Sequence, residues 1–157
     1  MKAKGFILAL AALITTASAK GQDVGEWCIS PKLNLYANTG HNVVVGMGAG
    51  LRYSITQSVR IEPSFICMFD NRSIAELSFD AHYLFFFGEA WRVYPVAGFL
   101  VNNVGWGNWS SGMNLGAGAD YAIDDAWDVS AAFKWQPMFG MGRRNPLVIT
   151  LGASYKF

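Results

Sequence analysis

Three side chains of the types found in nucleophilic catalytic triads lie in polar breaks of the sequence. His41, Asp70 and Ser73 supply an imidazole, a carboxylate and a hydroxyl group. Such groups act together only when they lie within hydrogen-bonding distance. Each also has an ordinary explanation, because Asp and Ser favour turns and a histidine in a turn is readily solvated. No sequence motif ties the three together, and we therefore expect no catalytic activity.

Charged side chains form a second set of candidates, and they recur at alternate positions of several apolar stretches. The members of the predicted network are Arg52, Arg60, Glu62, Asp80, His82, Arg92, Asp120 and Asp128. Equivalent positions hold Lys32, Glu76, Lys134 and Lys156. Acidic and basic groups nearly balance in this set, and buried charges are stable only when they are paired. The spacing therefore predicts a network of ion pairs inside the protein.

The alternation of apolar and polar residues also predicts the elements that position these charges. In Pro146–Phe157 every odd-numbered residue is apolar, whereas the even-numbered residues are mostly small or polar. Side chains of a β-strand alternate between its two faces, so this segment is predicted to be a strand with one apolar face. A tilted strand of roughly 9–11 residues is long enough to cross a bilayer.

Seven more segments share this pattern. The eight predicted strands are residues 27–37, 43–53, 59–69, 75–85, 91–101, 113–121, 127–135 and 147–157. None of their odd-numbered positions is charged, although 15% of the chain is charged. A transmembrane helix over residues 93–119 is disfavoured, because Pro95 and several glycines interrupt it and no 3.6-residue stripe appears. The sequence predicts an all-β fold, an eight-stranded antiparallel up-and-down transmembrane β-barrel.

Two observations predict that the apolar face points outward, against lipid. The interior of an eight-stranded barrel is only just wide enough for side chains to fill, and the apolar faces of all strands would overfill it. Aromatic residues also collect at the strand ends that short turns join, namely Trp27, Tyr53, Tyr83, Phe85, Trp91, Tyr121, Trp127, Tyr155 and Phe157. Such a girdle is typical of barrels in membranes. A secreted soluble barrel with an apolar interior is the alternative that these observations disfavour.

The beginning of the chain has the features of a signal peptide. Lys2 and Lys4 precede a short apolar run, and small residues ending at Ala19 supply a cleavage site. We therefore expect a signal peptide over residues 1–19 and a single barrel domain over residues 20–157. The formal net charge of +1 argues against a nucleic-acid partner.

Short turns would place like charges opposite each other in two hairpins. Arg52 is expected to face Arg60, and Asp120 is expected to face Asp128. In an eight-stranded ring the first pair lies across from the second, so we expect the two arginines to reach across the lumen to the two aspartates and close it.

Two further pairs follow from the same alternation. Glu62 is expected to lie opposite His82, where a hydrogen bond would form. Cys28 and Cys67 fall on opposite faces of non-adjacent strands, which predicts two unpaired thiols. The spacing of Cys and His residues matches no metal-site motif, so we expect no metal.

The predicted signal peptide, the eight alternating strands, the short turns at one end and the terminal Phe157 together resemble the small OmpA/OmpX-type outer-membrane barrels. The resemblance implies a location in an outer membrane of the Gram-negative type, with outer-membrane lipid and lipopolysaccharide as surroundings. In that family the last strand is read by the barrel-assembly machinery, and Tyr155, Phe157, Leu151 and Ile149 match its pattern. No cofactor is implied. The chain departs from the family in its short outer loops, and we expect no periplasmic domain, so adhesion and peptidoglycan anchoring are not expected.

Three functions remain open for such a barrel. We expect a monomer with a charge-plugged lumen and a structural or outer-loop interaction role, in which Arg143 and Arg144 contact lipopolysaccharide phosphates. One alternative is an enzyme that modifies lipid A through His41, Asp70 and Ser73, which all fall at the end with the longer loops. The other is a narrow pore for small solutes.

Overall fold

The strands alternate in burial along their length as the two-residue period predicts. The computed structural model describes residues 23–39, 42–69, 73–103, 109–139 and 145–157. Its strands are β1 Trp27–Ala37, β2 Val44–Ser54, β3 Val59–Phe69, β4 Ser73–Tyr83, β5 Phe85–Phe87, β6 Trp91–Asn102, β7 Ser110–Ala122, β8 Trp127–Trp135, β9 Met138–Phe139 and β10 Leu147–Lys156. In β1 and β6 exposed and buried residues alternate almost without interruption. No helix among the described residues is long and apolar enough to cross a membrane.

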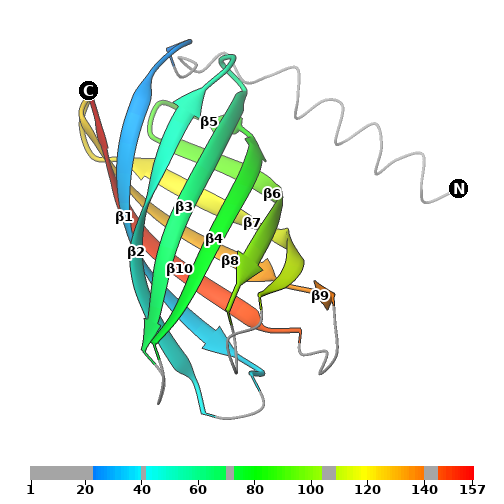
Figure 1. Ribbon diagram of the computed structural model, residues 1–157. Coiled ribbons are helices and arrows are strands. Elements are labelled where there is room, and N and C mark those ends of the chain that lie inside the picture. Colours follow the sequence, from blue (N-terminus) through cyan, green and yellow to red (C-terminus); the bar gives the residue numbers. More distant parts are fainter. Residues whose placement is uncertain (1–22, 40–41, 70–72, 104–108, 140–144) are drawn as a thin grey trace, which may run out of the picture.

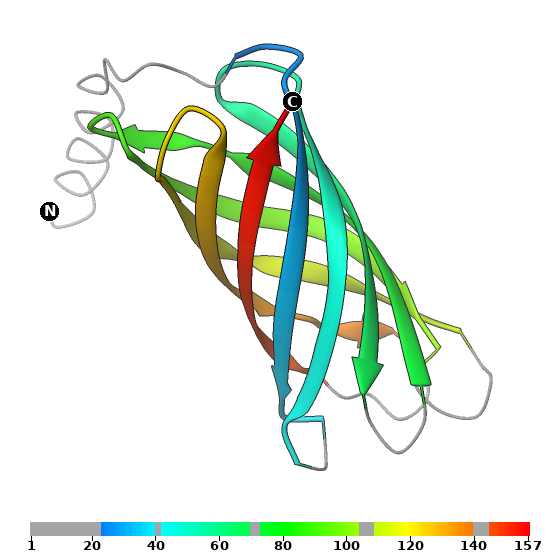
Figure 2. The same ribbon diagram turned by 90° about the vertical axis from the view of Figure 1, so that its left-hand side faces the viewer.

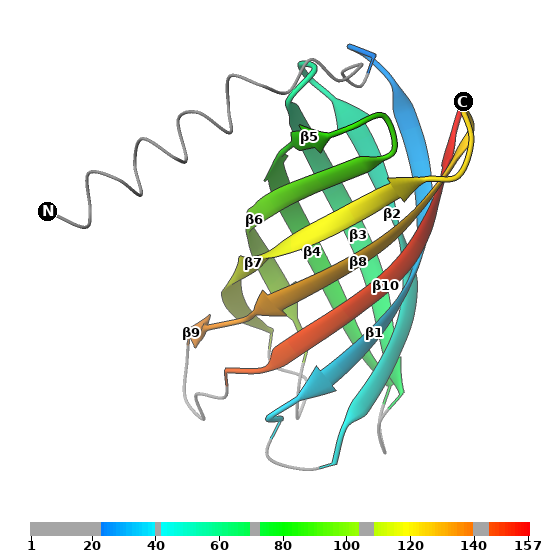
Figure 3. The same ribbon diagram turned by 180° about the vertical axis from the view of Figure 1, so that it is seen from behind.

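The sheet closes on itself (Figure 1). All neighbouring strands pair antiparallel, β1 pairs with both β2 and β10, and β6 pairs with both β4 and β7. Figure 3 shows β6, β7, β8 and β10 running side by side with a pronounced tilt. The two short segments β5 and β9 extend β4 and β8, so the barrel has eight strands. The predicted fold class is confirmed.

The two ends of the barrel differ in their connections. We call the end with the short connections 55–58, 88–90 and 123–126 and the C-terminus the turn end. The opposite end, where β1 ends and β2 begins, is called the loop end. Figure 2 shows β10 beside β1, with the C-terminus at the turn end.

Two regions differ from the prediction. The fourth predicted strand is interrupted at Leu84, whose N–H donates to the Ser58 carbonyl at 2.7 Å, and in the described part of the chain β5 pairs with β6. The expected loop after residue 136 contains β9, which pairs with Ser111 and Gly112 of β7. Pro137, which lacks an N–H, separates β9 from β8 because it cannot continue the ladder.

Large apolar side chains cover the outside of the barrel. Phe65, Phe79 and Phe99 are each 47–67% exposed. At the turn end aromatic rings form cross-strand contacts, with centroid distances of 4.6 Å for Trp27–Tyr53 and 5.0 Å for Trp91–Tyr121 and Trp127–Tyr155. The rings of Tyr83 and Phe85, which are two residues apart in the chain, also lie 5.0 Å apart. The apolar face is therefore the outer face, and the predicted girdle surrounds one end of it.

Two apolar clusters lie inside the barrel, one toward each end. At the loop end the cluster consists of Tyr36, Val44, Ile66, Met68, Ile74 and Val148. At the turn end it consists of Leu84, Tyr94 and Val96, with Phe86 packed against it. Cys28 is buried and Cys67 is exposed, and both thiols are free.

Candidate functional site

The register of the β2–β3 hairpin determines which charges meet at the turn end of the lumen. The N–H groups of Ile55 and Thr56 both donate to the Val59 carbonyl, at 2.9 and 3.1 Å. This turn is centred on Gln57 rather than on Thr56, and it places Ser54 opposite Arg60. The expectation that Arg52 faces Arg60 is therefore wrong.

The β7–β8 hairpin repeats this turn. The N–H groups of Ile123 and Asp124 donate to the Trp127 carbonyl at 2.9 and 3.3 Å. As a result Asp128 lies opposite Ala122 and Asp120 lies opposite Ser130. The two aspartates do not face each other, which corrects the second like-charge pair. In both hairpins the centre of the turn lies one residue further along the chain, which avoids the repulsion that directly opposed like charges would produce.

Asp120 is the acceptor at the centre of the charged lumen. Arg60 Nη1 lies 2.7 Å from its Oδ2, and Arg52 Nη1 lies 3.5 Å from its Oδ1. The Tyr94 hydroxyl donates to Oδ1 at 2.9 Å. The carboxylate is fully buried, and its two cations and its hydroxyl donor compensate for the lost hydration.

Arg60 and Tyr94 form a stack with the histidine of the site. Arg60 Nε donates to His82 Nδ1 at 3.1 Å, and Arg60 lies opposite His82 in the β3–β4 ladder. The expected pairing of Glu62 with His82 is therefore wrong, because Glu62 lies opposite Asp80 in this ladder. The Tyr94 ring lies 4.7 Å from the His82 ring and 4.8 Å from the Arg60 guanidinium carbon.

A glycine makes room for that stack. A Cβ at Gly118 would lie 2.7 Å from two carbon atoms of the Tyr94 ring, closer than such atoms approach each other. Only a residue without a side chain leaves the ring in this position, where its hydroxyl reaches Asp120.

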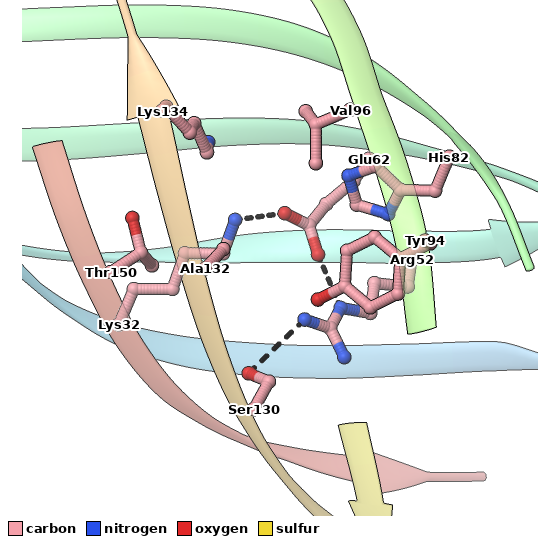
Figure 4. Close-up of a pocket in the computed structure, with 10 residues that line it drawn as sticks. All are labelled: Lys32, Arg52, Glu62, His82, Tyr94, Val96, Ser130, Ala132, Lys134 and Thr150. Atoms are coloured by element: carbon pink, nitrogen blue, oxygen red, sulfur yellow. Dashed lines mark hydrogen bonds and ion pairs between the residues drawn. The ribbon is translucent and has the colours of Figure 1, made fainter. Parts of the chain in front are cut away.

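Glu62 joins a second group of cations (Figure 4). Lys32 Nζ and Arg52 Nε contact its two carboxylate oxygens. Arg52 also donates from Nη2 to the Ser130 hydroxyl at 3.3 Å. Arg52 thus contacts both Glu62 and Asp120 and connects the two carboxylates into one ion-paired cluster.

Asp80 carries the network toward the loop end. Lys134 Nζ lies 2.6 Å from Oδ2, and the Asn114 amide donates to Oδ1 at 2.6 Å. Gln136 Nε2 donates both to Asn114 Oδ1 at 2.9 Å and to Glu76 Oε1 at 3.3 Å. Polar contacts therefore continue from the central charges to Glu76, which accepts a hydrogen bond from Tyr36 of the loop-end apolar cluster.

Asp128 forms a separate group at the turn end. Arg92 Nη2 lies 2.5 Å and Lys156 Nζ 3.4 Å from its Oδ1. The expectation that Arg52 and Arg60 share both aspartates is therefore wrong for Asp128: in the described residues, these arginines meet Asp120, and Asp128 is paired with two other cations.

One group of potential metal ligands lies in the lumen. Ligand atoms of Glu62, Asp80 and His82 lie within 4.8 Å of one another, and all three residues are buried. However, Lys and Arg side chains already contact both carboxylates, and the Arg60 N–H occupies Nδ1 of the imidazole. A metal cation would have to displace these positive groups, so the arrangement does not favour one.

Only some of the remaining predicted site residues lie in the described part of the chain. His41, Asp70, Arg143 and Arg144 lie outside the described residues, and Ser73 begins β4. Tyr155 lies on the outer face and Phe157 follows β10, with its N–H donating to the Trp27 carbonyl at 3.1 Å. No triad geometry is therefore established.

Sequence reasoning missed the uncharged members of the network. Tyr36, Tyr94, Asn114, Ser130 and Thr150 occupy inward positions of predicted strands, so alternation alone would have included them. Gln136 lies just beyond the predicted end of its strand, and no pattern indicated it.

Comparisons with known proteins concern the fold. No protein-family model matches the chain, and no curated protein matches it. The N-terminal barrel domain of Pseudomonas aeruginosa OprF is 21% identical, with a TM-score of 0.70 over 87% of this chain and 100% of that one. Ail of Yersinia pestis is 17% identical, with a TM-score of 0.58 over 86% and 100%. A chain from de novo design of transmembrane β-barrels is 14% identical, with a TM-score of 0.66 over 87% and 99%.

These structures share the closed eight-stranded architecture, and each of them aligns with 86–87% of this chain. Together with the lipophilic outer face and the charged interior, they identify the fold of this chain as that of the small outer-membrane β-barrels.

Proposed function

We propose that the protein is an integral outer-membrane barrel with a closed lumen, which acts as a structural component of the envelope or presents its outer loops to lipid or a partner. The observation that carries this proposal is the filled interior. Arg60, Asp80 and Asp120 are fully buried in ion pairs, and apolar clusters lie inside the barrel toward both of its ends. A solute would have to break several buried charge pairs to pass.

The location in an outer membrane rests on the outer surface and on the fold. Exposed apolar side chains surround the barrel, and the aromatic girdle at the turn end is suited to a membrane interface. By analogy with barrels of this architecture, the turn end would face the periplasm and the loop end the exterior.

Planar-bilayer recording tests the closed lumen. We expect the wild-type protein to insert without stepwise conductance. The variants Asp120→Asn and Asp128→Asn would show whether removing one charge of the network opens a path, and Asp125→Asn in an exposed turn is the matched control. Steady wild-type conductance typical of a water-filled pore would refute the proposal.

The proposal includes no enzymatic activity. A mass-spectrometric profile of lipid A from cells with and without the protein should be the same, and a modification that disappears with the protein would favour the alternative with His41, Asp70 and Ser73.

The predicted lipopolysaccharide contact is tested separately. The pair Arg143→Lys and Arg144→Lys keeps the charge but loses bidentate phosphate contacts. We expect lipopolysaccharide to stabilise the wild-type protein in nanodiscs more than this double variant. Equal stabilisation would remove the two arginines from the proposal.

A further inference from the structure

A small cavity lies within the charged middle of the lumen. Its volume is about 10 Å³, which is room for one water-sized occupant. Lys32, Arg52, Lys134, His82 and Thr150 line it together with Glu62 (Figure 4). These side chains come from six different strands, so the cavity is enclosed by the barrel wall on several sides.

The lining offers hydrogen-bond donors that the protein does not use. Lys32 and Lys134 each hold three N–H groups, and the contacts of each with a single carboxylate oxygen leave further hydrogens available. Arg52 Nη1 is buried and, among the described residues, makes no hydrogen bond, although it lies 3.5 Å from Asp120.

Two neutral residues add donors to the same space. The Thr150 hydroxyl is buried without a hydrogen-bond partner in the described part of the chain, and the residue is only 4% exposed. Because His82 Nδ1 accepts a hydrogen bond from Arg60, the neutral ring carries its hydrogen on Nε2. Both groups can therefore donate.

The acceptors around the cavity already have partners. Both oxygens of Glu62 contact cations, and the Ser130 oxygen accepts from Arg52. A water molecule both donates and accepts hydrogen bonds, whereas a halide anion only accepts them. The unused donors of the lining are thus suited to an anion.

The charge count around the cavity points the same way. The connected ion pairs of Lys32, Glu62, Arg52, Asp120 and Arg60 contain three cations and two carboxylates. The neighbouring pair of Lys134 and Asp80 is neutral in sum. Glu76, which is hydrogen-bonded to Tyr36 and Gln136, balances the third cation of the connected group. The wall of the cavity itself, however, carries three cations, Lys32, Arg52 and Lys134, and one carboxylate, Glu62. Positive charge is therefore concentrated around this space.

We propose that this cavity binds one small monovalent anion of the halide class, held by Lys32, Lys134, Arg52 and the Thr150 hydroxyl. The anion would sit among the three cations that line the cavity. It would have to be small, because the cavity admits a single water-sized particle without movement of the lysine chains.

Crystals grown in sodium bromide provide the direct test, because bromide has a distinctive anomalous signal. We expect an anomalous peak in the lumen within hydrogen-bonding range of Lys32 Nζ and Thr150 Oγ1. In parallel, the unfolding midpoint of the full folded barrel in detergent should rise with bromide concentration but not with gluconate at equal ionic strength. A lumen without a peak, together with equal midpoints in both salts, would show that water occupies the cavity and would overturn the proposal.

Substitutions at one hydroxyl separate this site from general salt effects. Thr150→Val removes the hydroxyl at nearly constant shape and should weaken the bromide dependence by about tenfold, as expected for one hydrogen bond to a charged group. Thr150→Ser should restore it. Ser54→Ala is the matched control, because the Ser54 hydroxyl is also buried without a hydrogen-bond partner among the described residues but does not line the cavity. A bromide dependence that is the same in Thr150→Val as in the wild type would contradict the assignment.

Discussion

Arg60 and Asp120 form a fully buried ion pair, with 2.7 Å between Nη1 and Oδ2 and no exposed part of either side chain. Arg60 belongs to β3 and Asp120 to β7, and these strands are not neighbours in the barrel. The ion pair therefore joins two parts of the wall across the lumen, where backbone hydrogen bonds cannot.

Removing the carboxylate of this pair should strongly destabilise the barrel. Asp120→Ala leaves the Arg60 and Arg52 charges and the Tyr94 hydroxyl without their acceptor, and a buried pair broken on one side typically costs about 3–5 kcal/mol. Urea unfolding in lipid vesicles, followed by tryptophan fluorescence, measures the change. Asp125→Asn in an exposed turn should stay within about 0.5 kcal/mol of the wild type. Equal losses in both variants would contradict the role of the ion pair.

A methyl group at Gly118 should displace the tyrosine that packs on it. Gly118→Ala places a Cβ 2.7 Å from the Tyr94 ring, and such overpacking typically costs about 1–3 kcal/mol. In a Tyr94→Ala background the same substitution should cost much less, because the ring is gone. A double-mutant cycle of unfolding free energies measures the coupling, and additive losses would show that Gly118 is needed for another reason.

Charge on the outer face should be costly in proportion to its depth. Leu151 lies in the middle of β10, and Ile55 lies in a turn at the barrel end; they are 46% and 45% exposed, respectively. Leu151→Arg should destabilise the protein in bilayers by about 2–4 kcal/mol, and Ile55→Arg by about 0–1 kcal/mol. Refolding into vesicles with urea titration gives both values. Equal costs for the two arginines would argue against a lipid-facing surface.

Deleting Phe157 should affect assembly in cells more than stability. The residue is 71% exposed and its N–H donates to the Trp27 carbonyl, so few packing contacts depend on its side chain. If the terminal aromatic is read by the assembly machinery, the deletion should lower the amount of barrel in the outer membrane while refolding in detergent remains near normal. Phe157→Tyr is the conservative control. Normal membrane levels after deletion would refute the assembly signal.

The faces of the strands could be predicted from the sequence, whereas the pairing of individual charges could not. Alternation is a property of each strand alone, so the inward position of Arg60 and the outward position of Phe65 follow from the residue order. The register depends on the turn, and nothing in residues 54–58 indicates that two N–H groups share the Val59 carbonyl. Moving the centre of the turn by one residue shifts the pairing by two, which brings Glu62, instead of Arg60, into contact with Arg52.

The ion-pair partners of long side chains also could not be predicted from the sequence. Arg92 contacts Asp128 although its partner in the β6–β7 ladder is Asp120. Asp120 instead forms ion pairs with arginines from β2 and β3. The choice depends on the three-dimensional curvature of the wall and on the space that glycines such as Gly118 leave inside it.

The pairing of β1 with β10 has a consequence for biogenesis. The first and last strands in the sequence are neighbours in the barrel, from Ala37 opposite Leu147 to Cys28 opposite Lys156. A nascent polypeptide that stops before β10 keeps two unsatisfied edges, which would promote aggregation or degradation. The barrel therefore cannot close until β10 has been made, so a chain that is truncated before Leu147 should not reach a stable folded state.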